Sequence, residues 1–566
     1  MWDPSYLQEE VAVEQIEVVE SVTKTIGSLA LAYPYLRRLQ VAETIDALVK
    51  AGKERQVATG AVIETLVLNR LQPRPSPISR LGAWAETQAI EEVYGLPASA
   101  LNDDRIGRAL DEIHPHLPEL WASLVLQGAQ AFGVRLDQLH SDVTRVAFEG
   151  DYADVPTASA AGQALARITR GYSGKDDPRR KQLTVSLSVS ADGGVPAWYQ
   201  VGDGNAADSQ TYPVHLAAVR EHLHLDHPLV VGDSKLITRG NCLGFCRAGA
   251  TFIGPSGLRA ADRTLLCQAW EKGAPWHRLD LPAPGAPPRA GRYWGLLHQE
   301  WLADPEEATT YPLRRLFVHS LDDRTAARHQ RAKELARARR ALWTIVHRLR
   351  YPAYRDVALV RRKATEAVAR VAAFVHVSVR CGEAGVQVAW QVDHDWLRAE
   401  ARFDGIYSLL TNLTGHQAQS RTIFRHYKEQ AVVEGRFRTF KHPPLQVRPL
   451  WLHQPQRLES LVFVVLLALF LFALIEREAR REVGQSGQVF TGLRADGRDR
   501  LPVTSTQLLA AFAPLSLVKQ RLRVGADIVD VRTPTTLTPI QAQILRRLHL
   551  PLPTVYVQPT ITPYPT

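Results

Sequence analysis

Four polar residues recur at helical spacing in the segment YKEQAVVEGRFRTFK, which runs from Tyr427 to Lys441. Tyr427, Gln430, Glu434 and Lys441 lie at offsets of 0, 3, 7 and 14 positions. At about 100° per residue, one continuous helix would place all four within about 60° of one another. A helix that only packs would carry apolar residues on such a stripe. A carboxylate can hold a hard cation and an amine or phenol can contact phosphate, so we predict a functional segment here.

Three acidic residues from separate elements could cooperate in metal chemistry. Asp142 lies in the β-rich sequence HSDVTRVAF, Asp233 follows the apolar run LVV, and Glu434 lies on the predicted helix. Phosphodiester cleavage develops charge that two divalent ions about 3.5–4 Å apart can neutralise. Mg²⁺ prefers carboxylate oxygens, so the three acids would form an open site if the two strands lie side by side. Singly, each acid has a structural alternative: a turn cap at Asp142, a helix cap at Asp233 and a surface charge at Glu434.

The segment resembles the Y-(2)-R-(3)-E-(6)-K motif of insertion-sequence transposases with a DDE, RNase H-like catalytic domain. Tyr427, Glu434 and Lys441 match in type and spacing, whereas Gln430 stands where the family has Arg. The flanking FDG (403–405) and RPLW (448–451) resemble the family's flanks. Upstream, HSDVTRVAFEG resembles the context of the first aspartate and LVVGDS that of the second. GYSGKDDPRRKQ (171–182) and GDGNAAD resemble the strand-turn region between the two aspartates. The resemblance covers roughly residues 30 to 480 and is closest to members with a helical N-terminal domain.

The resemblance implies a catalytic triad of Asp142, Asp233 and Glu434 that holds two Mg²⁺ or Mn²⁺ ions. It further implies cleavage at transposon ends and strand transfer into a target by a cut-and-paste mechanism. The partners would be double-stranded DNA, namely the terminal inverted repeats and the target, and a second copy of the chain in a synaptic dimer. Either a regulatory or decayed transposase that binds DNA without strand transfer, or a metal-dependent DNA nuclease, remains an alternative.

The resemblance also indicates which residues contact DNA. Tyr427 and Lys441 would contact phosphates near the cut. Gln430 keeps hydrogen-bonding capacity but lacks the charge of the family's Arg, and either Arg438 or Arg425 could compensate for it. Lys181, in the stretch between the two aspartates, is a further candidate.

The 201 positions from Asp233 to Glu434 exceed what a bare RNase H-like fold needs, and relatives carry an insertion domain there. The segment contains Trp276, Trp294 and Trp301. In relatives a tryptophan of this domain stacks on a flipped base, a favourable contact for any nucleobase. We name Trp294 as the candidate, with a structural role as the alternative for each tryptophan.

The elements that must position these residues follow from periodicity. Strands are predicted at 143–148, 183–189, 195–201 and 228–231, with a hairpin turn at Asp192-Gly193-Gly194 and a helix at 215–223. This order predicts an α/β fold, an RNase H-like mixed sheet interrupted by an insertion. The predicted domains are an all-helical N-terminal domain that binds DNA or only packs (1–125), the first catalytic part (126–260), the insertion (261–398), the second catalytic part (399–480) and a C-terminal extension (481–566).

Residues 324–363 carry 13 Lys and Arg against Glu334 and Asp356. Apolar residues at 335, 342, 346 and 349 predict one amphipathic helix whose basic face contacts phosphates or is only solvated. Strands are predicted at 385–392 and 399–410, a proline-rich loop at 280–290 and a disordered tail from about 550.

Composition sets the broad class of this 566-residue chain. Its net charge is +10, which suits an anionic partner. Four cysteines cannot form a disulfide framework, and Cys242, Cys246 and the histidines at 222, 224 and 227 are predicted to be structural rather than zinc ligands. The longest apolar run, 461–475, is shorter than the roughly 18–20 residues of a membrane span, so we predict a core helix and no membrane. With no visible export signal, we expect a cytoplasmic, bacterial, nucleoid-associated protein.

Overall fold

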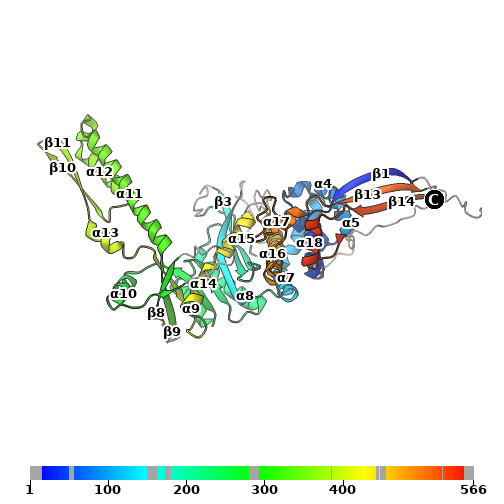
Figure 1. The fold of residues 1–566 in the computed structure, drawn as a ribbon, viewed down its shortest axis with the longest axis horizontal. Coiled ribbons are helices and arrows are strands. Elements are labelled where there is room, and N and C mark those ends of the chain that lie inside the picture. The colour runs from blue at the N-terminus through cyan, green and yellow to red at the C-terminus, as the bar shows by residue number, and fades with distance from the viewer. Residues whose placement is uncertain are drawn as a thin grey trace, which may run out of the picture. The chain divides into compact units, whose positions relative to one another are not determined.

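The structure is a computed structural model that describes residues 16–49, 57–148, 158, 162, 164–171, 180–279, 292–383, 385–441, 445, 454–524 and 527–553. The chain has the mixed α/β fold predicted from its sequence (Figure 1). It forms two compact units. The first comprises Met1–Val231 and Glu429–Thr566, and the second is the continuous segment Gly232–Lys428.

Four neighbouring strands of a mixed sheet organise the first unit. In the spatial order β4-β3-β2-β5, they are Pro196–Gly202, Lys181–Ser190, Gln138–Phe148 and Leu229–Val231. β2 pairs antiparallel with β3 and parallel with β5. The predicted hairpin is confirmed: Gly193 and Gly194 between β3 and β4 have φ values of 85° and 66°. Two successive positive φ angles suit the twist of a tight hairpin, and glycine adopts them without a steric cost.

Helices form most of the N-terminal part of this unit. They are α1 (Leu29–Arg38), α2 (Val41–Leu48), α3 (Thr59–Arg70), α4 (Leu81–Glu86), α5 (Ile90–Tyr94), α6 (Asp103–Ile113) and α7 (Leu117–Phe132). α6 has an N-terminal cap, because the Asn102 side chain accepts a hydrogen bond from the Arg105 N–H. The all-helical prediction is wrong at the start of the segment, where Ile16–Thr25 forms the strand β1.

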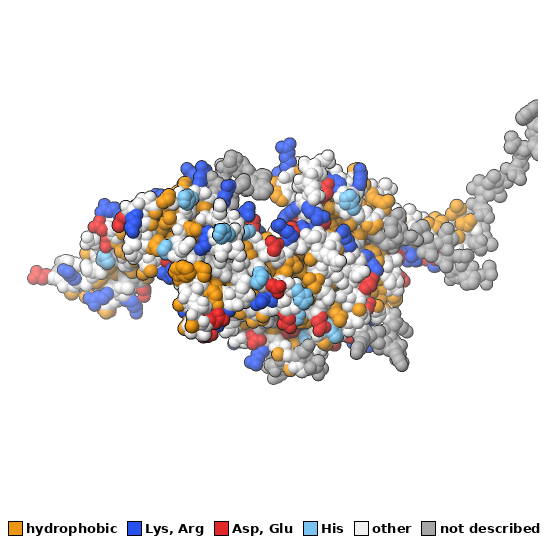
Figure 2. Space-filling view, turned by 90° about the horizontal axis from the view of Figure 1, so that it is seen from below, with side chains coloured by type: hydrophobic (Ala, Val, Ile, Leu, Met, Phe, Trp, Pro, Cys, Tyr) orange, Lys and Arg blue, Asp and Glu red, His pale blue; other side chains and the backbone are white. Residues whose placement is uncertain are grey.

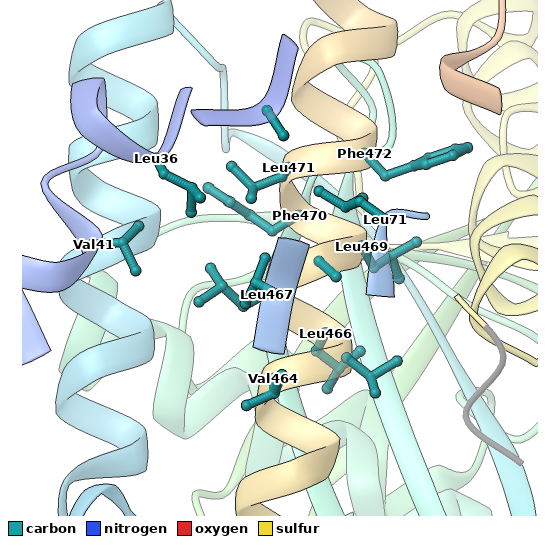
Figure 3. Packing of buried hydrophobic residues seen from close by; sticks show 14 of the residues in the cluster. Leu36, Val41, Leu71, Val464, Leu466, Leu467, Leu469, Phe470, Leu471 and Phe472 are labelled. Carbon is teal, nitrogen blue, oxygen red and sulfur yellow. The ribbon is translucent and has the colours of Figure 1, made fainter. Parts of the chain in front are cut away.

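The core of the first unit surrounds one long apolar helix, α16 (Pro455–Ser486). Residues 461–475 are at most 3% exposed, and α16 packs on α1, α3, α6, α7 and α15. Figure 3 shows its leucine and phenylalanine side chains among Leu36, Val41 and Leu71 of the N-terminal helices. By length and composition α16 could cross a membrane, with a mean hydropathy of 2.9, but 94% of that window is buried inside the protein. The prediction of a buried core helix is confirmed.

β1 forms a small antiparallel sheet with β13 (Ser516–Val524) and β14 (Asp527–Pro534), two strands from the C-terminal part of the chain. The pairing register puts charged residues on one face, where Glu17 bonds Arg523 and Arg521 bonds Asp530. The other face is apolar and includes Ile16 and Val18, which are 64% and 53% exposed. Figure 2 shows hydrophobic side chains on the surface near these strands. The unit is completed by α8 (Thr211–Leu223), α17 (Ser505–Ala511) and α18 (Pro539–Arg547).

His215 of α8 makes the first unit sensitive to pH. It is buried, and Ser186 and Ser188 of β3 lie 2.6 and 2.9 Å from its two ring nitrogens. Burial lowers its pKa from 6.5 to about 4. The neutral form is therefore favoured in the folded state, so this contribution to stability is present above pH 6.5 and is lost as the pH falls towards 4.

We expect the wild-type protein to lose about 2 kcal/mol of unfolding free energy between pH 7 and pH 5 through this group. Urea denaturation at the two pH values measures the loss. In the His215→Gln variant the difference between the two pH values should shrink by about that amount, whereas His549→Gln, at an exposed histidine, should leave it unchanged. An undiminished pH difference in His215→Gln would show that another group carries the effect.

The second unit contains an antiparallel sheet in the order β6-β12-β9-β8-β7. Its strands are Thr251–Ser256, Ile406–Thr411, Thr309–Ser320, Tyr293–Asp304 and His277–Arg278. β8 and β9 pair as one antiparallel hairpin. Accompanying helices are α9 (Arg239–Arg247), α10 (Ala260–Glu271) and α14 (Ser420–Lys428).

The same unit carries a separate small core built by α11 (Leu321–Arg348), α12 (Val357–Val368) and the hairpin of β10 (Val375–Gly382) and β11 (Gly385–Val392). The single basic helix predicted for 324–363 is in fact two helices. Pro352 follows the break, where it cannot continue the hydrogen bonding of α11. The strand predicted at 399–410 begins only at Ile406, since His394–Glu400 forms α13.

Several predicted features lie outside the described residues. They are the proline-rich loop at 280–290, the RPLW segment at 448–451, most of the 171–182 stretch and the tail from residue 554. The predictions made for these segments therefore remain untested predictions.

Candidate functional site

Strand β2 presents Asp142 on the face that also carries His140, because side chains alternate along a strand. Asp142 lies mid-strand, opposite Leu187 of β3, and is half-buried. Its Oδ1 accepts the Val143 N–H at 2.8 Å. On the other face, Ser141 contacts Ser188 at 2.6 Å between the two hydroxyl oxygens. The sheet therefore fixes the backbone of Asp142 and directs its carboxylate to one known side.

Glu434 lies on α15 (Ala431–Lys441), a helix that packs on β2 and β3. Val433, Phe437 and Phe440 are buried, whereas Glu434 is exposed. Arg438 and Lys441, four and seven positions later, share its face of the helix; Arg438 is exposed and Lys441 half-buried. α15 thus offers one carboxylate and two bases on a face that lies beside its packing face.

The continuous helix assumed between Tyr427 and Lys441 is wrong. α14 ends at Lys428, residues 429 and 430 form a turn, and α15 begins at Ala431. Tyr427 lies on α14 in the second unit, so the calculated four-residue stripe does not exist. Its ring is half-buried, with its centroid 6.1 Å from that of Tyr407.

A hydrogen-bond network joins the turn before α15 to β2. Gln430 Nε2 donates to the Ser141 carbonyl at 3.0 Å, and Gln430 Oε1 lies 3.0 Å from His140 Nδ1. Gln138 Nε2 in turn lies 3.0 Å from His140 Nε2 and donates to Glu429 Oε2 at 3.0 Å. His140 is fully buried, so the network sits in a protected environment. Gln430 therefore connects the strand of Asp142 with the helix of Glu434.

We expect Gln430→Ala to lower DNA cleavage by about tenfold or more, because it releases α15 from the strand beside Asp142. Loss of hydrogen bonds to a buried partner should also cost about 1–3 kcal/mol of stability. Cleavage assays and urea denaturation measure the two effects, with Gln520→Ala on β13 as the matched control. A Gln430→Ala protein that cuts like the wild type would show that the network does not position the site.

A buried arginine holds the middle of α15 in place. Arg436, 5% exposed, donates to the carbonyls of Gly194 and Gly193 at 2.9 and 2.7 Å and to Glu476 Oε1 at 3.0 Å. These partners belong to the β3–β4 turn and to α16. The position of α15 is therefore tied to the sheet and to the core helix at once.

Asp233 follows strand β5 in the chain. β5 ends at Val231, which is the parallel partner of His140, so Asp142 and Asp233 each lie two residues beyond a paired position. Asp233 is half-buried, and its Oδ1 accepts the Lys235 N–H at 2.9 Å. Asp233 belongs to the second unit, whereas Asp142 and Glu434 belong to the first.

Among the described residues, no group of three or more His, Cys, Asp and Glu side chains is close enough to hold a metal ion. The donor chemistry of the three predicted acids still fits a hard divalent ion, since all three offer only carboxylate oxygens. The four cysteines are all free. His222 stacks on Trp198, with ring centroids 5.0 Å apart and planes inclined by 7°.

The second unit contains an aromatic pocket of about 560 Å³. Trp294 of β8 and Trp276 line it together with His319 of β9, whose ring centroid lies 6.0 Å from that of Trp294. Trp270, Arg324, Arg402, Leu321 and Ile406 complete the wall. Burial and the charge of Arg324 lower the pKa of His319, which favours its neutral ring. The pocket thus combines flat apolar faces with two guanidinium groups.

Sequence reasoning identified Trp294 and Trp276 but missed Trp270, His319 and Arg402. These three come from α10, β9 and the turn before β12, so no local pattern connects them. Trp301 does not line the pocket and is 67% exposed. Lys181 is half-buried at the start of β3, opposite Phe148 of β2.

A family model described as "Transposase DDE domain" matches residues 153–471, and one described as "Domain of unknown function (DUF4277)" matches residues 21–126. Asp233 and Glu434 lie within the first match, and Asp142 precedes it. No curated protein matches the chain. The cryo-EM structure of a piggyBac transposase synaptic complex with hairpin DNA is 8% identical, covers 95% of this chain and 86% of its own and has a TM-score of 0.35, a likeness too weak to carry an argument.

The transposase model covers more than half of the chain, including the strands β3 to β5, the whole second unit, α15 and most of α16's apolar run. The resemblance to transposases that the motifs indicated is therefore confirmed at the level of the family. The chain belongs to the family of proteins with a transposase DDE domain.

Proposed function

We propose that this protein is a DNA transposase that cuts transposon ends and joins them to target DNA, with Asp142, Asp233 and Glu434 as its metal-binding carboxylates. One observation carries the proposal: β2 and β5 are parallel neighbours in a register that makes Asp142 and Asp233 equivalent positions beyond the paired residues His140 and Val231.

The register limits how far apart the two aspartates can be. Neighbouring strands lie about 4.8 Å apart. Asp233 follows the last paired residue of β5 by two positions, and a chain of two residues spans at most about 7 Å. Two side chains tethered in this way can reach a common pair of cations. Glu434 approaches the same face of β2 on α15, which the contacts of Gln430 hold against the strand.

Each residue of this set has a distinct task. Bound divalent ions, Mg²⁺ or Mn²⁺, would supply charge neutralisation for the attacking and leaving oxygens. Asp142 would hold them from the sheet and Asp233 from the segment just after β5, and exposed Glu434 would complete the ligand set from the helix. Gln430 would position Glu434 rather than grip phosphate, because its amide oxygen and nitrogen both face β2.

The exposed face of α15 supports a path for DNA beside the carboxylates. Arg438 and Lys441 share that face with Glu434, and bases at this place can hold the phosphates that flank a cut. Lys181 and Tyr427 would add further phosphate contacts. The pocket around Trp294 would take an unpaired base, since it pairs aromatic faces with Arg324 and Arg402. Two copies of the chain would hold the two transposon ends in one synaptic complex.

The test is incubation of the full-length protein with DNA that carries the element's own ends, in Mg²⁺, in Mn²⁺ and in EDTA. We expect metal-dependent cuts at the junction of transposon and flank, followed by joined products when target DNA is added. Cuts without joined products would favour a nuclease. Binding of the ends without cuts would favour a regulatory or decayed transposase and contradict the proposal.

A further inference from the structure

The turn between α11 and α12 exposes two large aromatic rings. Trp343 on α11 is 55% exposed, and Tyr351, just after the helix ends, is 49% exposed. They line a shallow hollow of about 410 Å³ together with Thr344, His347, Arg348 and Arg350. Rings of this size gain much from burial, so their shared exposure marks a place where something binds.

The neighbouring side chains hold both rings in position. The Trp343 ring meets that of Trp390 from β11 edge to face, with centroids 6.0 Å apart and planes inclined by 77°. The centroid of His347 lies 5.8 Å from that of Trp343. The guanidinium carbon of Arg350 lies 5.0 Å from the centre of the Tyr351 ring, and Arg350 Nη2 donates to the Tyr351 hydroxyl at 3.1 Å. A flat ligand would therefore meet surfaces that are already ordered.

The surroundings of the hollow are strongly basic. Between residues 337 and 365 the chain has nine Lys and Arg and a single acid, Asp356. Asp356 caps α12 by accepting the Ala358 N–H at 2.8 Å. The six exposed bases nearest in sequence to the two rings are Arg337, Arg339, Arg340, Arg348, Arg350 and Arg355. A ligand of this surface must carry negative charge.

We propose that this hollow, the platform formed by Trp343, His347, Arg350 and Tyr351, binds single-stranded DNA by stacking unpaired bases on its rings. Single strands offer both phosphates for the arginines and exposed base faces for the rings, whereas the bases of a duplex are already stacked on one another. A protein partner would need an unusually acidic surface to match the same bases. The platform is separate from the Trp294 pocket, with which it shares no lining residue. The inference rests on the proposed function only in taking DNA as the substrate.

The experiment measures binding of a fluorescent oligothymidine, and of a duplex of equal length, to the full-length protein in EDTA. We expect Trp343→Ala and Tyr351→Ala each to weaken oligothymidine binding by about fivefold or more and to change duplex binding much less. Trp343→Phe should keep most of the affinity, since a ring remains. Arg350→Gln should also lower the salt dependence of binding, which loss of a ring does not.

Trp301→Ala is the matched control. Trp301 is more exposed than Trp343, but Asp304, Glu306 and Glu307 follow it in the chain, so its removal should leave oligothymidine binding unchanged. Wild-type affinity in Trp343→Ala, or equal losses for single strand and duplex, would overturn the platform. The binding assay contains EDTA and therefore does not depend on a metal site. If binding depends on the rings but the protein fails to cut DNA, the proposed function alone is contradicted. Normal cutting with ring-independent binding would sink only this inference.

Discussion

Glu434→Gln should reduce DNA cleavage by at least about a thousandfold while the protein stays folded. Stabilisation of transition-state charge by bound metal is worth several kcal/mol, and each 1.36 kcal/mol is a factor of ten in rate. The amide has the size of the carboxylate but lacks the negative charge that holds a hard cation. Because Glu434 is exposed on α15, its replacement should cost little stability. Cleavage of end DNA under single-turnover conditions measures the loss.

The matched control for this substitution is Glu482→Gln, at a carboxylate on α16 far along the chain from the three acids. It should cut at the wild-type rate. The Asp142→Asn and Asp233→Asn variants should fall as far as Glu434→Gln and still bind end DNA. Cleavage within tenfold of the wild type in any of the three would remove that residue from the metal-binding set.

Arg436→Met should lower the free energy of unfolding by about 3–5 kcal/mol, the usual cost of removing one partner of a buried ion pair. The change leaves Glu476 without its buried partner and the carbonyls of Gly193 and Gly194 without their donor. Among the described residues, Glu476 would keep the partly exposed Arg480 and the Ser505 N–H as partners. α15 would then lose its tie to the hairpin turn, so cleavage should fall as well.

Urea denaturation of Arg436→Met and Arg438→Met separates the stability lost with a buried arginine from the stability lost with an exposed positive charge. The two arginines lie two positions apart on α15, but Arg438 is exposed, so its loss should change stability by less than about 0.5 kcal/mol. Equal effects in the two variants would mean that the interactions of Arg436 do not hold the helix.

Local sequence signals predicted much of the first unit. The segments 183–189 and 195–201 alternate polar and apolar residues and are joined by an Asp-Gly-Gly turn, and this combination predicts a β-hairpin. The apolar run at 461–475 predicted a core helix because it was too short, and too closely bounded by charges, for a membrane span. Both features depend on neighbours in sequence, and both are present in the structure.

Features that depend on distant partners were not predictable in this way. β1 is a strand because it pairs with β13, almost 500 residues later. The helix across 427–441 breaks at residues 429 and 430 because the side chains of Glu429 and Gln430 bond to β2, which no helical periodicity reveals. Those contacts also change the expected task of Gln430, from phosphate contact to positioning of the helix.

In the candidate site, too, some features follow from local sequence and others only from the fold. Motif spacing selected Asp142, Asp233 and Glu434, and the register of β2 with β5 gives two of them a common place in the sheet. The wall of the Trp294 pocket combines residues from 270 to 406, so its composition required the fold.

Metal rescue of cysteine variants tests the central claim most directly. Asp142→Cys and Asp233→Cys replace an oxygen ligand with a thiolate, which binds Mn²⁺ better than it binds Mg²⁺ and suits Cd²⁺ best. Both variants should be inactive on end DNA in Mg²⁺ and should regain cleavage in Mn²⁺ or Cd²⁺, whereas a cysteine at Ser234 should change nothing. Inactivity of both variants in every metal, or activity of both in Mg²⁺, would contradict a metal site built on these two aspartates.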